Sequence, residues 1–422
     1  MRIIPITIRN DSRRFDRSEK KRFLPSLLPT FKETTNDQIQ DNASGDGGER
    51  RRLLGSGSSV SLYGSVSTGL LYSNSASLSG GVDAKGDPLD NQQSVDSFSM
   101  ESGFWGDSIW GITGEEDLGN GWTVGFTLEN EFGSDTGEMA SDGTIFDSQA
   151  YLRIGNDKVN FAFGNIGGLS SAGGDFDLIC GFDPMEAYVG VAGLGAFASK
   201  DYASGNMAVV EVTPMEGLKV SLMGNTGDDD SSEAKWSDRD HYYGLGVSYE
   251  SGPLALAAIA EMRKYDKKAE RNNLSDNDNS WTFTVAAAYD FEVIRPSFVY
   301  QHASKTREFG ASDPSESSGA YNFDSFMLGA TAPLGQGTLR ASVQYVKGEN
   351  DAVSDEEGSA TILGLAYTYD MSKRTTLYGA AFYSVGGDGL DKDLGTNEMA
   401  FGLMDRAEYN SVGFGVGLVH TF

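Results

Sequence analysis

The sequence lacks most of what a soluble enzyme or a helical membrane protein needs. It holds one cysteine, Cys180, and three histidines in 422 residues, so an internal disulfide is excluded and a histidine or cysteine metal centre has too few ligands. The longest apolar runs, Leu254–Ala260 and Val285–Ala288, fall far short of the roughly 18 residues that a membrane-spanning helix requires. Basic residues are also scarce, 33 against 61 acidic ones, and the net charge of −28 argues against a nucleic-acid ligand.

Glycine and aromatic residues are abundant, and they follow a period of two. The chain holds 54 glycines, 23 phenylalanines and 18 tyrosines but only 10 prolines, which favours close-packed strands and aromatic belts over helices. From Trp281 to Phe291 every second residue is apolar, and the same alternation occurs in the last strand, Tyr409–Phe422, where glycines occupy the other face. In several strands the charged residues lie opposite the apolar face, as expected for a barrel with lipid outside and water inside.

Short and long connections alternate along residues 58–422. The short ones contain turn residues in all but one case and lie at 118–121, 156–157, 213–217, 251–253, 291–293, 334–337 and 370–373. The long ones lie at about 73–106, 133–145, 165–199, 226–240, 265–279, 306–320, 348–358 and 385–408. Together they predict an all-β, sixteen-stranded antiparallel transmembrane barrel. A β-sandwich or a solenoid is the alternative, but such folds seldom alternate short and long connections in this way.

The first 57 residues differ from the rest of the chain. They carry twelve basic and eight acidic side chains, which leaves the remaining 365 residues with a net charge of −32. Their lack of periodicity predicts a disordered basic leader. The apolar segment Phe23–Pro29 is too short and too rich in proline for a secretory signal, so we expect either a misassigned start, a non-native leader or a basic tail.

The segment 58–422 resembles the general porins of proteobacteria, the sixteen-stranded trimeric outer-membrane proteins. The resemblance rests on Ser59–Gly64, Trp110–Thr123, Gln149–Arg153, Phe163–Asn165 and Gly417–Phe422, with Asp142–Phe146 similar to alphaproteobacterial members. It implies that the third long loop, 165–199, folds into the barrel and narrows the channel. It also implies a homotrimer, and that the terminal Phe422 is the signal read by the barrel-assembly machinery.

Charged residues of that loop and of the facing wall are the predicted pore constriction. The loop carries Asp175, Asp177, Asp183 and Glu186 and no basic residue. By strand alternation Arg153 and Arg340 point into the lumen, so acids and bases would set up a field across the narrowest section. The alternative for the acids is ordinary solvated loop charge, and for Arg153 a place in the lumen away from the constriction. Cys180 in the same loop is expected to be a small apolar filler.

We therefore predict a diffusion pore in the bacterial outer membrane that passes ions and small hydrophilic solutes, prefers cations and has no enzymatic activity. A solute-specific porin, a plugged adhesion or binding barrel and an outer-membrane enzyme are the alternatives, and the last has no nucleophile motif to support it. Outer-membrane lipid and lipopolysaccharide are the expected surroundings. No cofactor is predicted, although Ca²⁺ binding by the acidic runs 228–230, 272–278 and 355–357 is an alternative to solvated charge.

Overall fold

The computed structural model describes residues 58–78, 92–141, 143–197, 204–227, 236, 239–264, 279–306, 321–350, 357–386 and 408–422. The predicted leader and two of the acidic runs, 228–230 and 272–278, lie outside these ranges, as do the first two residues of the third run. No helix in the described ranges reaches the length and apolarity that crossing a membrane requires.

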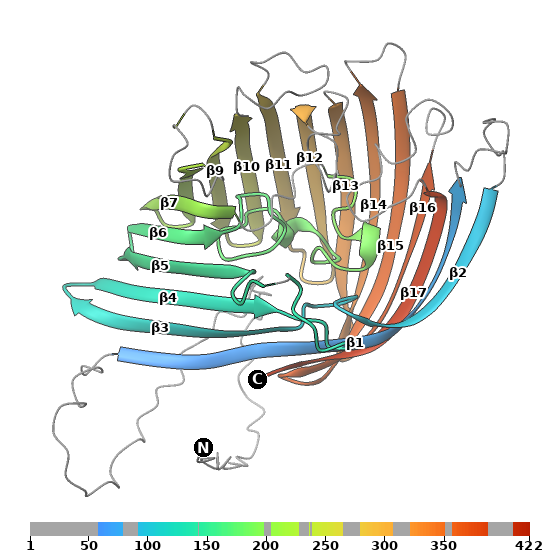
Figure 1. The fold of residues 1–422 in the computed structure, drawn as a ribbon, viewed down its shortest axis with the longest axis horizontal. Helices are drawn as coiled ribbons and strands as arrows, with labels where there is room; N and C mark the ends of the chain where they lie inside the picture. The colour runs from blue at the N-terminus through green and yellow to red at the C-terminus, as the bar shows by residue number, and fades with distance from the viewer. Residues whose placement is uncertain are drawn as a thin grey trace, which may run out of the picture. The chain divides into compact units, whose positions relative to one another are not determined.

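The described chain is one antiparallel sheet closed into a barrel (Figure 1). Apart from β2 and β3, which both pair with β1, every strand pairs with its neighbours in sequence. The last strand pairs with the first, from Ser65 opposite Thr421 to Ser77 opposite Glu408. The terminal strand therefore lies beside the first one, and this pairing closes the barrel. The strands are β1 Ser58–Leu78, β2 Gln92–Ser102, β3 Ile109–Gly119, β4 Trp122–Glu131, β5 Gln149–Gly155, β6 Val159–Ile166, β7 Ser204–Met215, β8 Leu218–Asn225, β9 His241–Ser251, β10 Leu254–Lys264, β11 Ser280–Tyr289, β12 Arg295–Thr306, β13 Tyr321–Leu334, β14 Gly337–Asn350, β15 Glu357–Ser372, β16 Thr375–Gly386 and β17 Glu408–Thr421.

The seventeen strand segments occupy sixteen strand positions around the barrel, which we call staves. The count is sixteen because β2 and β3 lie end to end in one stave. β2 pairs with the second half of β1, from Thr68 to Leu78, and β3 pairs with the first half, from Ser58 to Ser65. Gly103–Ser108 interrupt this stave. The predicted count of sixteen is therefore confirmed, but the predicted first long loop at 73–106 is wrong: β1 continues to Leu78, and most of residues 92–106 belong to the wall or to its interruption.

All seven short connections are confirmed and lie at one rim. They leave two to five residues between strands, and glycines with positive φ occupy several of them, among them Gly121 (78°), Gly217 (77°) and Gly335 (65°). Only glycine adopts such backbone angles without a steric cost, which explains how the chain reverses in so few residues. The strand ends that lead into the long connections lie at the other rim.

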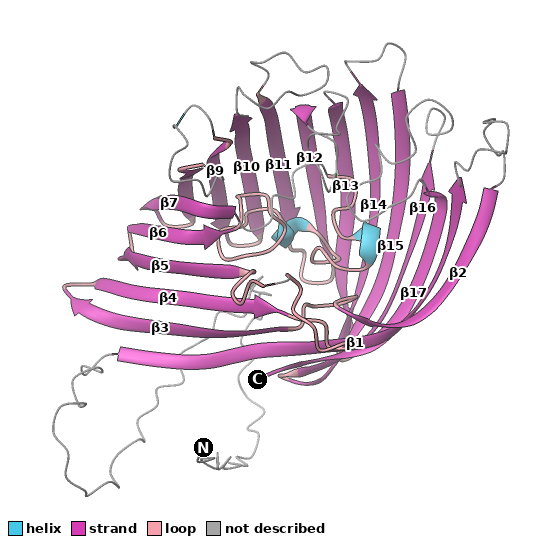
Figure 2. Ribbon diagram, viewed as in Figure 1, coloured by secondary structure: helices cyan, strands magenta, loops and turns pink. Residues whose placement is uncertain are grey.

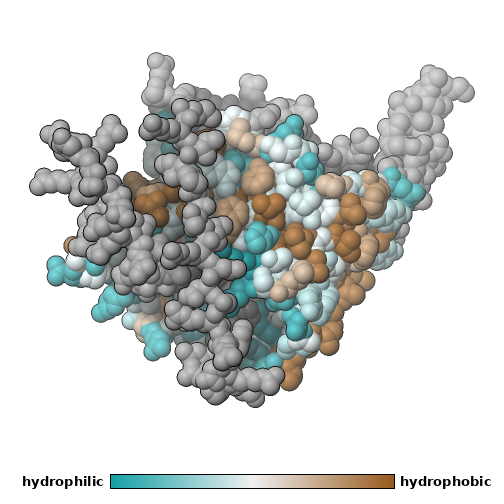
Figure 3. All heavy atoms as spheres, turned by 90° about the horizontal axis from the view of Figure 1, so that it is seen from below, coloured by the Kyte–Doolittle hydropathy of each residue, from teal (hydrophilic) through white to brown (hydrophobic). Residues whose placement is uncertain are grey.

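The two faces of the wall differ as the alternation predicts. Trp281, Phe283 and Val285 of β11 are between 41% and 48% exposed on the outer face, whereas Thr282 and Thr284 between them are buried on the inner face. Hydrophobic side chains gather over the part of the outer wall at the right of Figure 3. An apolar outer face with a polar inner one is the arrangement that a lipid environment requires.

The face of β17 that carries the glycines points into the barrel, where aromatic rings cover it. A Cβ added at Gly413 would collide with Phe382, and one added at Gly415 would collide with Phe104. The sequence predicts that this face borders a water-filled lumen. The structure corrects that expectation, because the glycines make room for these packed side chains.

Candidate functional site

The third long loop lies inside the barrel. Figure 2 shows its two short helices, η1 (Cys180–Phe182) and η2 (Gly190–Ala192), within the ring of strands. Its apolar side chains are fully buried there, including Leu169, Ile179, Met185, Val189, Leu194 and Phe197. η1 packs near β11 and β12, and η2 near β15 and β16. The inward-folded third loop is therefore confirmed.

Hydrogen bonds fix the loop to inward-facing wall residues from β9 to β14. Near its start the Tyr242 hydroxyl accepts a bond from the Leu169 N–H (3.1 Å), and Ser170 donates its hydroxyl to Glu261. Near its end Gln344 donates to the Ala192 carbonyl (2.6 Å) and accepts from the Ala196 N–H (3.1 Å). Because both ends of the segment are held by side chains on different strands, the loop is a fixed part of the barrel interior.

Two of the four predicted loop acids bond to the loop itself. Asp177 accepts hydrogen bonds from the backbone N–H groups of Ala172 (2.9 Å), Ile179 (3.1 Å) and Cys180 (2.7 Å). Burial raises the pKa of Asp177 to about 7, although these three bonds favour the charged form. Asp183 is buried and accepts from Met185 and Ala187, both at 2.9 Å. Both carboxylates thus shape the loop.

The other two loop acids reach the barrel wall. Asp175 is exposed and accepts a hydrogen bond from the Tyr151 hydroxyl on β5. Glu186 pairs with Arg340 on β14, with 2.6 Å between Oε1 and Nη1. These two loop carboxylates therefore contact side chains of the wall.

The two predicted wall arginines lie in different places. Arg340 contacts the loop: besides Glu186 it donates to the Pro184 carbonyl (3.0 Å), and its guanidinium lies 4.9 Å from the centre of the Trp105 ring. Arg153 instead pairs with Glu115 on β3, where both side chains are more than one-third exposed. Arg295, near the end of its strand, donates to the loop carbonyl of Gly181 (3.1 Å). The structure therefore brings Arg340 and Arg295 to the loop and places Arg153 with a wall acid.

The interruption of the second stave, Gly103–Ser108, is a part of the site that sequence reasoning missed. It turns into the barrel between Gly103 and Gly106, whose φ angles are 78° and 79°. There the Phe104 carbonyl accepts from the Val189 N–H (2.9 Å), and Asp107 accepts from the Tyr188 hydroxyl (2.9 Å). The aromatic pair between two glycines was the available signal.

Acidic side chains line the wall at β4, across the barrel from Arg295. Glu129 on β4 accepts from the hydroxyls of Tyr63 (2.8 Å) and Ser148 (2.6 Å), and its neighbours on the same face are Thr127 and Glu131. In a closed barrel of sixteen staves, β4 lies opposite β12, which carries Arg295. Glu129 and Arg295 thus lie on opposite sides of the barrel, whereas Arg153 and Arg340 each lie beside an acid.

Cys180 lies half-buried in η1, and its N–H is one of the donors to Asp177. Burial raises the pKa of its thiol well above the usual value, so the thiolate is disfavoured. This environment suits the small filler that the sequence predicts.

Comparison with known proteins identifies a family and a set of relatives. The family model described as Gram-negative porin matches residues 43–388. The chain is 26% identical over 394 residues to an outer membrane porin protein of Bordetella pertussis, covering 86% of this chain and 94% of the relative. Among solved structures it is similar to the anion-selective porin from Comamonas acidovorans (TM-score 0.63, 23% identity, 86% and 100% of the two chains covered). It also resembles the trimer form of OmpT of Vibrio cholerae (TM-score 0.56, 15% identity, 87% and 100% covered).

Proposed function

The chain belongs to the Gram-negative porin family, and from this premise we propose that it passes ions and small hydrophilic solutes passively, with a preference for cations. It is an outer-membrane channel and not an enzyme. The observation that carries the proposal is the loop fixed inside a barrel whose inner wall is polar. A fixed loop of this kind sets the width and charge of a pore without any catalytic group.

The charges around the lumen support the cation preference. Acidic side chains on inward-facing positions and on the third loop outnumber the basic ones, and three of the basic ones are engaged: Arg340 by Glu186, Arg153 by Glu115 and Lys219 by Glu211 (3.1 Å). The residues outside the leader carry a net charge of −32. A negative potential over the mouth raises the local concentration of cations. The Comamonas porin is anion-selective, but at 23% identity its likeness concerns the fold.

A reversal-potential measurement tests the selectivity. Refolded full-length protein is inserted into a planar bilayer under a gradient of potassium chloride. We expect the reversal potential to have the sign produced when potassium permeates more readily than chloride. Anion permeation would contradict the proposal. The same recording distinguishes a pore from a plugged adhesion barrel, which would give no conductance steps.

A solute-specific porin is the second candidate, because the loop is held rigidly and lined with directional polar groups. Swelling of liposomes in neutral sugars of increasing size separates the two. In a general pore the swelling rate falls smoothly as the sugar becomes larger. In a specific pore one sugar enters faster than its size predicts.

We also propose that the chain works as a homotrimer inserted by the barrel-assembly machinery and surrounded by lipopolysaccharide. A trimer form is known for the OmpT relative. Cross-linking of the purified protein in mild detergent tests the oligomeric state.

A further inference from the structure

The interruption of the second stave, Gly103–Ser108, is bonded to the neighbouring strand β1. The Ser67 hydroxyl donates to the Trp105 carbonyl (2.6 Å). The Ser108 hydroxyl accepts a bond from the Ser67 N–H and donates one to the Ser67 carbonyl, both at 3.0 Å. These side-chain bonds stand where the ladder between β1 and the second stave is missing, so the interruption has a fixed place in the wall.

Two aromatic side chains of the interruption are buried inside the barrel. Phe104 lies against Tyr378 on β16, with the ring centroids 6.4 Å apart, and occupies the space above Gly415 on β17. Trp105 lies against Tyr188 of the third loop, also with 6.4 Å between the centroids. The interruption thus contacts the wall with one ring and the loop with the other.

Hydrogen bonds add to the contact between the interruption and the loop. The Phe104 carbonyl accepts from the Val189 N–H, and the Asp107 carboxylate accepts from the Tyr188 hydroxyl, both at 2.9 Å. Strand register cannot bring these residues together, because the loop is not part of the sheet. The loop is therefore held here by the interruption as well as by the strands.

The loop backbone at this contact is strained. Glu186, Ala187 and Val189 have φ angles of 54°, 65° and 68°, in a region that residues other than glycine seldom adopt and β-branched residues least of all. Such a conformation persists only where surrounding contacts hold it. Arg340 holds Glu186, and the interruption holds Val189.

The interruption also brings a carboxylate to the lumen. Asp107, Tyr188 and Glu186 keep part of their surface accessible, whereas Phe104 and Trp105 are buried. Glu186 is paired with an arginine, but no ion pair among the described residues involves Asp107, whose side chain is bonded to a neutral hydroxyl. Its charge is therefore not balanced by a bonded cation.

We propose that the interruption is a second constriction element beside the third loop: its bonds to Tyr188 and Val189 position the loop, and Asp107 favours the passage of cations. The proposal deepens the pore function proposed above and rests on it. A carboxylate beside the passage attracts cations and repels anions, and a fixed loop keeps the width of the passage constant.

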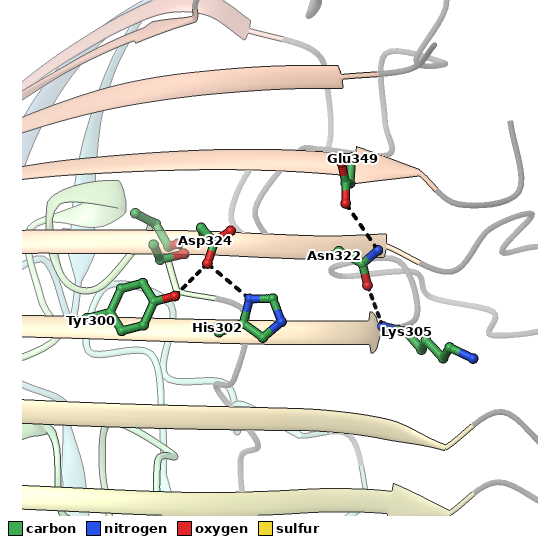
Figure 4. Close-up of polar contacts among 8 residues, drawn as sticks. Tyr300, His302, Lys305, Asn322, Asp324 and Glu349 are labelled. Atoms are coloured by element: carbon green, nitrogen blue, oxygen red, sulfur yellow. Dashed lines mark hydrogen bonds and ion pairs between the residues drawn. The ribbon is translucent and has the colours of Figure 1, made fainter. Parts of the chain in front are cut away.

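A polar cluster on the outer face of β12 and β13 provides matched controls (Figure 4). Asp324 accepts hydrogen bonds from the Tyr300 hydroxyl (2.7 Å) and from Nδ1 of His302 (3.0 Å). The side chains of Asp324 and His302 are more than one-third exposed and alternate along their strands with the buried Gln301 and Ser325, so they face away from the lumen. This cluster contains the same kind of tyrosine–aspartate bond outside the pore.

Asp107→Asn tests the charge. The amide oxygen can still accept the bond from Tyr188, so the loop should keep its place while the charge is lost. An elementary charge about 7 Å from an ion in water changes the energy of that ion by about RT. We therefore expect the ratio of potassium to chloride permeability, measured by reversal potential at about pH 8, to fall at least about twofold. Asp324→Asn should leave the ratio unchanged, because its charge lies on the other side of the wall and is screened by salt.

Tyr188→Phe tests the positioning of the loop. It removes the hydroxyl and keeps the charge of Asp107, so the permeability ratio should not fall. One hydrogen bond contributes about fivefold to an equilibrium constant. In single-channel recordings the time spent in conductance levels other than the main one should therefore rise by up to about fivefold. Tyr300→Phe removes the corresponding bond outside the pore and should leave the conductance levels unchanged.

Each half of the proposal can be overturned separately. If Asp107→Asn keeps the permeability ratio of the unmodified protein, Asp107 does not act on permeating ions. If Tyr188→Phe and Tyr300→Phe give the same conductance levels, the interruption does not hold the loop. A purely structural role would lower the stability of the Asp107 and Tyr188 variants and move neither electrical property. The shift in ratio is measured against the unmodified protein, so it can be read whichever ion that protein prefers, whereas an unmodified protein without conductance would overturn the pore function itself.

Discussion

Arg340 on β14 and Glu186 in the third loop form an ion pair whose nitrogen and oxygen atoms are 2.6 Å apart, and Trp105 from the interrupted stave lies against the same guanidinium. Three segments distant in sequence therefore meet at one arginine. The Arg340 side chain is only 16% exposed. Charge-assisted bonds in such a partly buried place are stronger than those at a surface. This contact connects the charge of the lumen with the position of the loop.

Replacement Arg340→Gln should loosen the loop and shift selectivity further toward cations. The variant leaves Glu186 without its partner and removes a positive charge from the lumen. We expect the free energy of unfolding to fall by about 2 kcal/mol and the reversal potential to move toward that of potassium. Chemical denaturation and bilayer recording measure the two effects.

Arg153→Gln is the control for this substitution. Its pair with Glu115 is more than one-third exposed on both sides, so the expected loss of stability is below about 1 kcal/mol. It removes the same charge from the lumen without touching the loop. Equal destabilisation by the two substitutions would contradict a special role of Arg340.

The barrel could be predicted from the sequence because each strand residue meets one of two environments. Apolar outward positions such as Phe283 and Val285 and polar inward ones such as Thr284 follow directly from the period of two. The turns were predictable for a local reason as well, since glycine at Gly217 or Gly335 allows backbone angles that other residues avoid.

The interior of the barrel was less predictable because its contacts are long-range. The inward turn at Gly103–Gly106 is held by the third loop, and Asp107 and Tyr188 are 81 residues apart. No local pattern encodes that distance. In contrast, the bonds of Asp177 to Ile179 and Cys180 span two and three residues, and this Asx-type spacing was readable from the sequence.

Gly415→Ala should destabilise the closure of the barrel. A Cβ at this position collides with the ring of Phe104, which is buried and cannot move aside freely. We expect a loss of about 1–3 kcal/mol, measured by denaturation of the refolded protein. Gly379→Ala is the control, because its nearest neighbour would be Val416 at 3.8 Å, an ordinary contact. Equal stability of the two variants would show that Phe104 does not pack on β17.

Asp177 should make stability depend on pH. Its pKa of about 7 in the folded protein lies above the ordinary value, so the folded state holds a proton that the unfolded chain releases. The contribution to stability is complete below about pH 4 and is lost as the pH rises through about 7. The midpoint temperature of thermal unfolding should therefore fall as the pH rises between these limits. It should fall more in the unmodified protein than in Asp177→Asn. Asp175→Asn, an exposed acid of the same loop, should keep the full dependence. A variant Asp177→Asn with an unchanged pH profile would contradict the assignment.

Phe422→Ala should impair assembly in the cell far more than stability in the test tube. The backbone of Phe422 exchanges two hydrogen bonds with Gly64, at 2.9 and 3.3 Å, and an alanine keeps both. The ring is 43% exposed, so its removal should cost the refolded barrel less than about 1 kcal/mol. If the ring is a recognition signal, the amount of folded protein in the outer membrane should still fall severalfold. Phe414→Ala removes a ring that is 53% exposed on the same strand and provides the control. Equal membrane levels of the two variants would show that Phe422 is not read as a signal, and a large loss of stability in vitro would assign its ring a structural role instead.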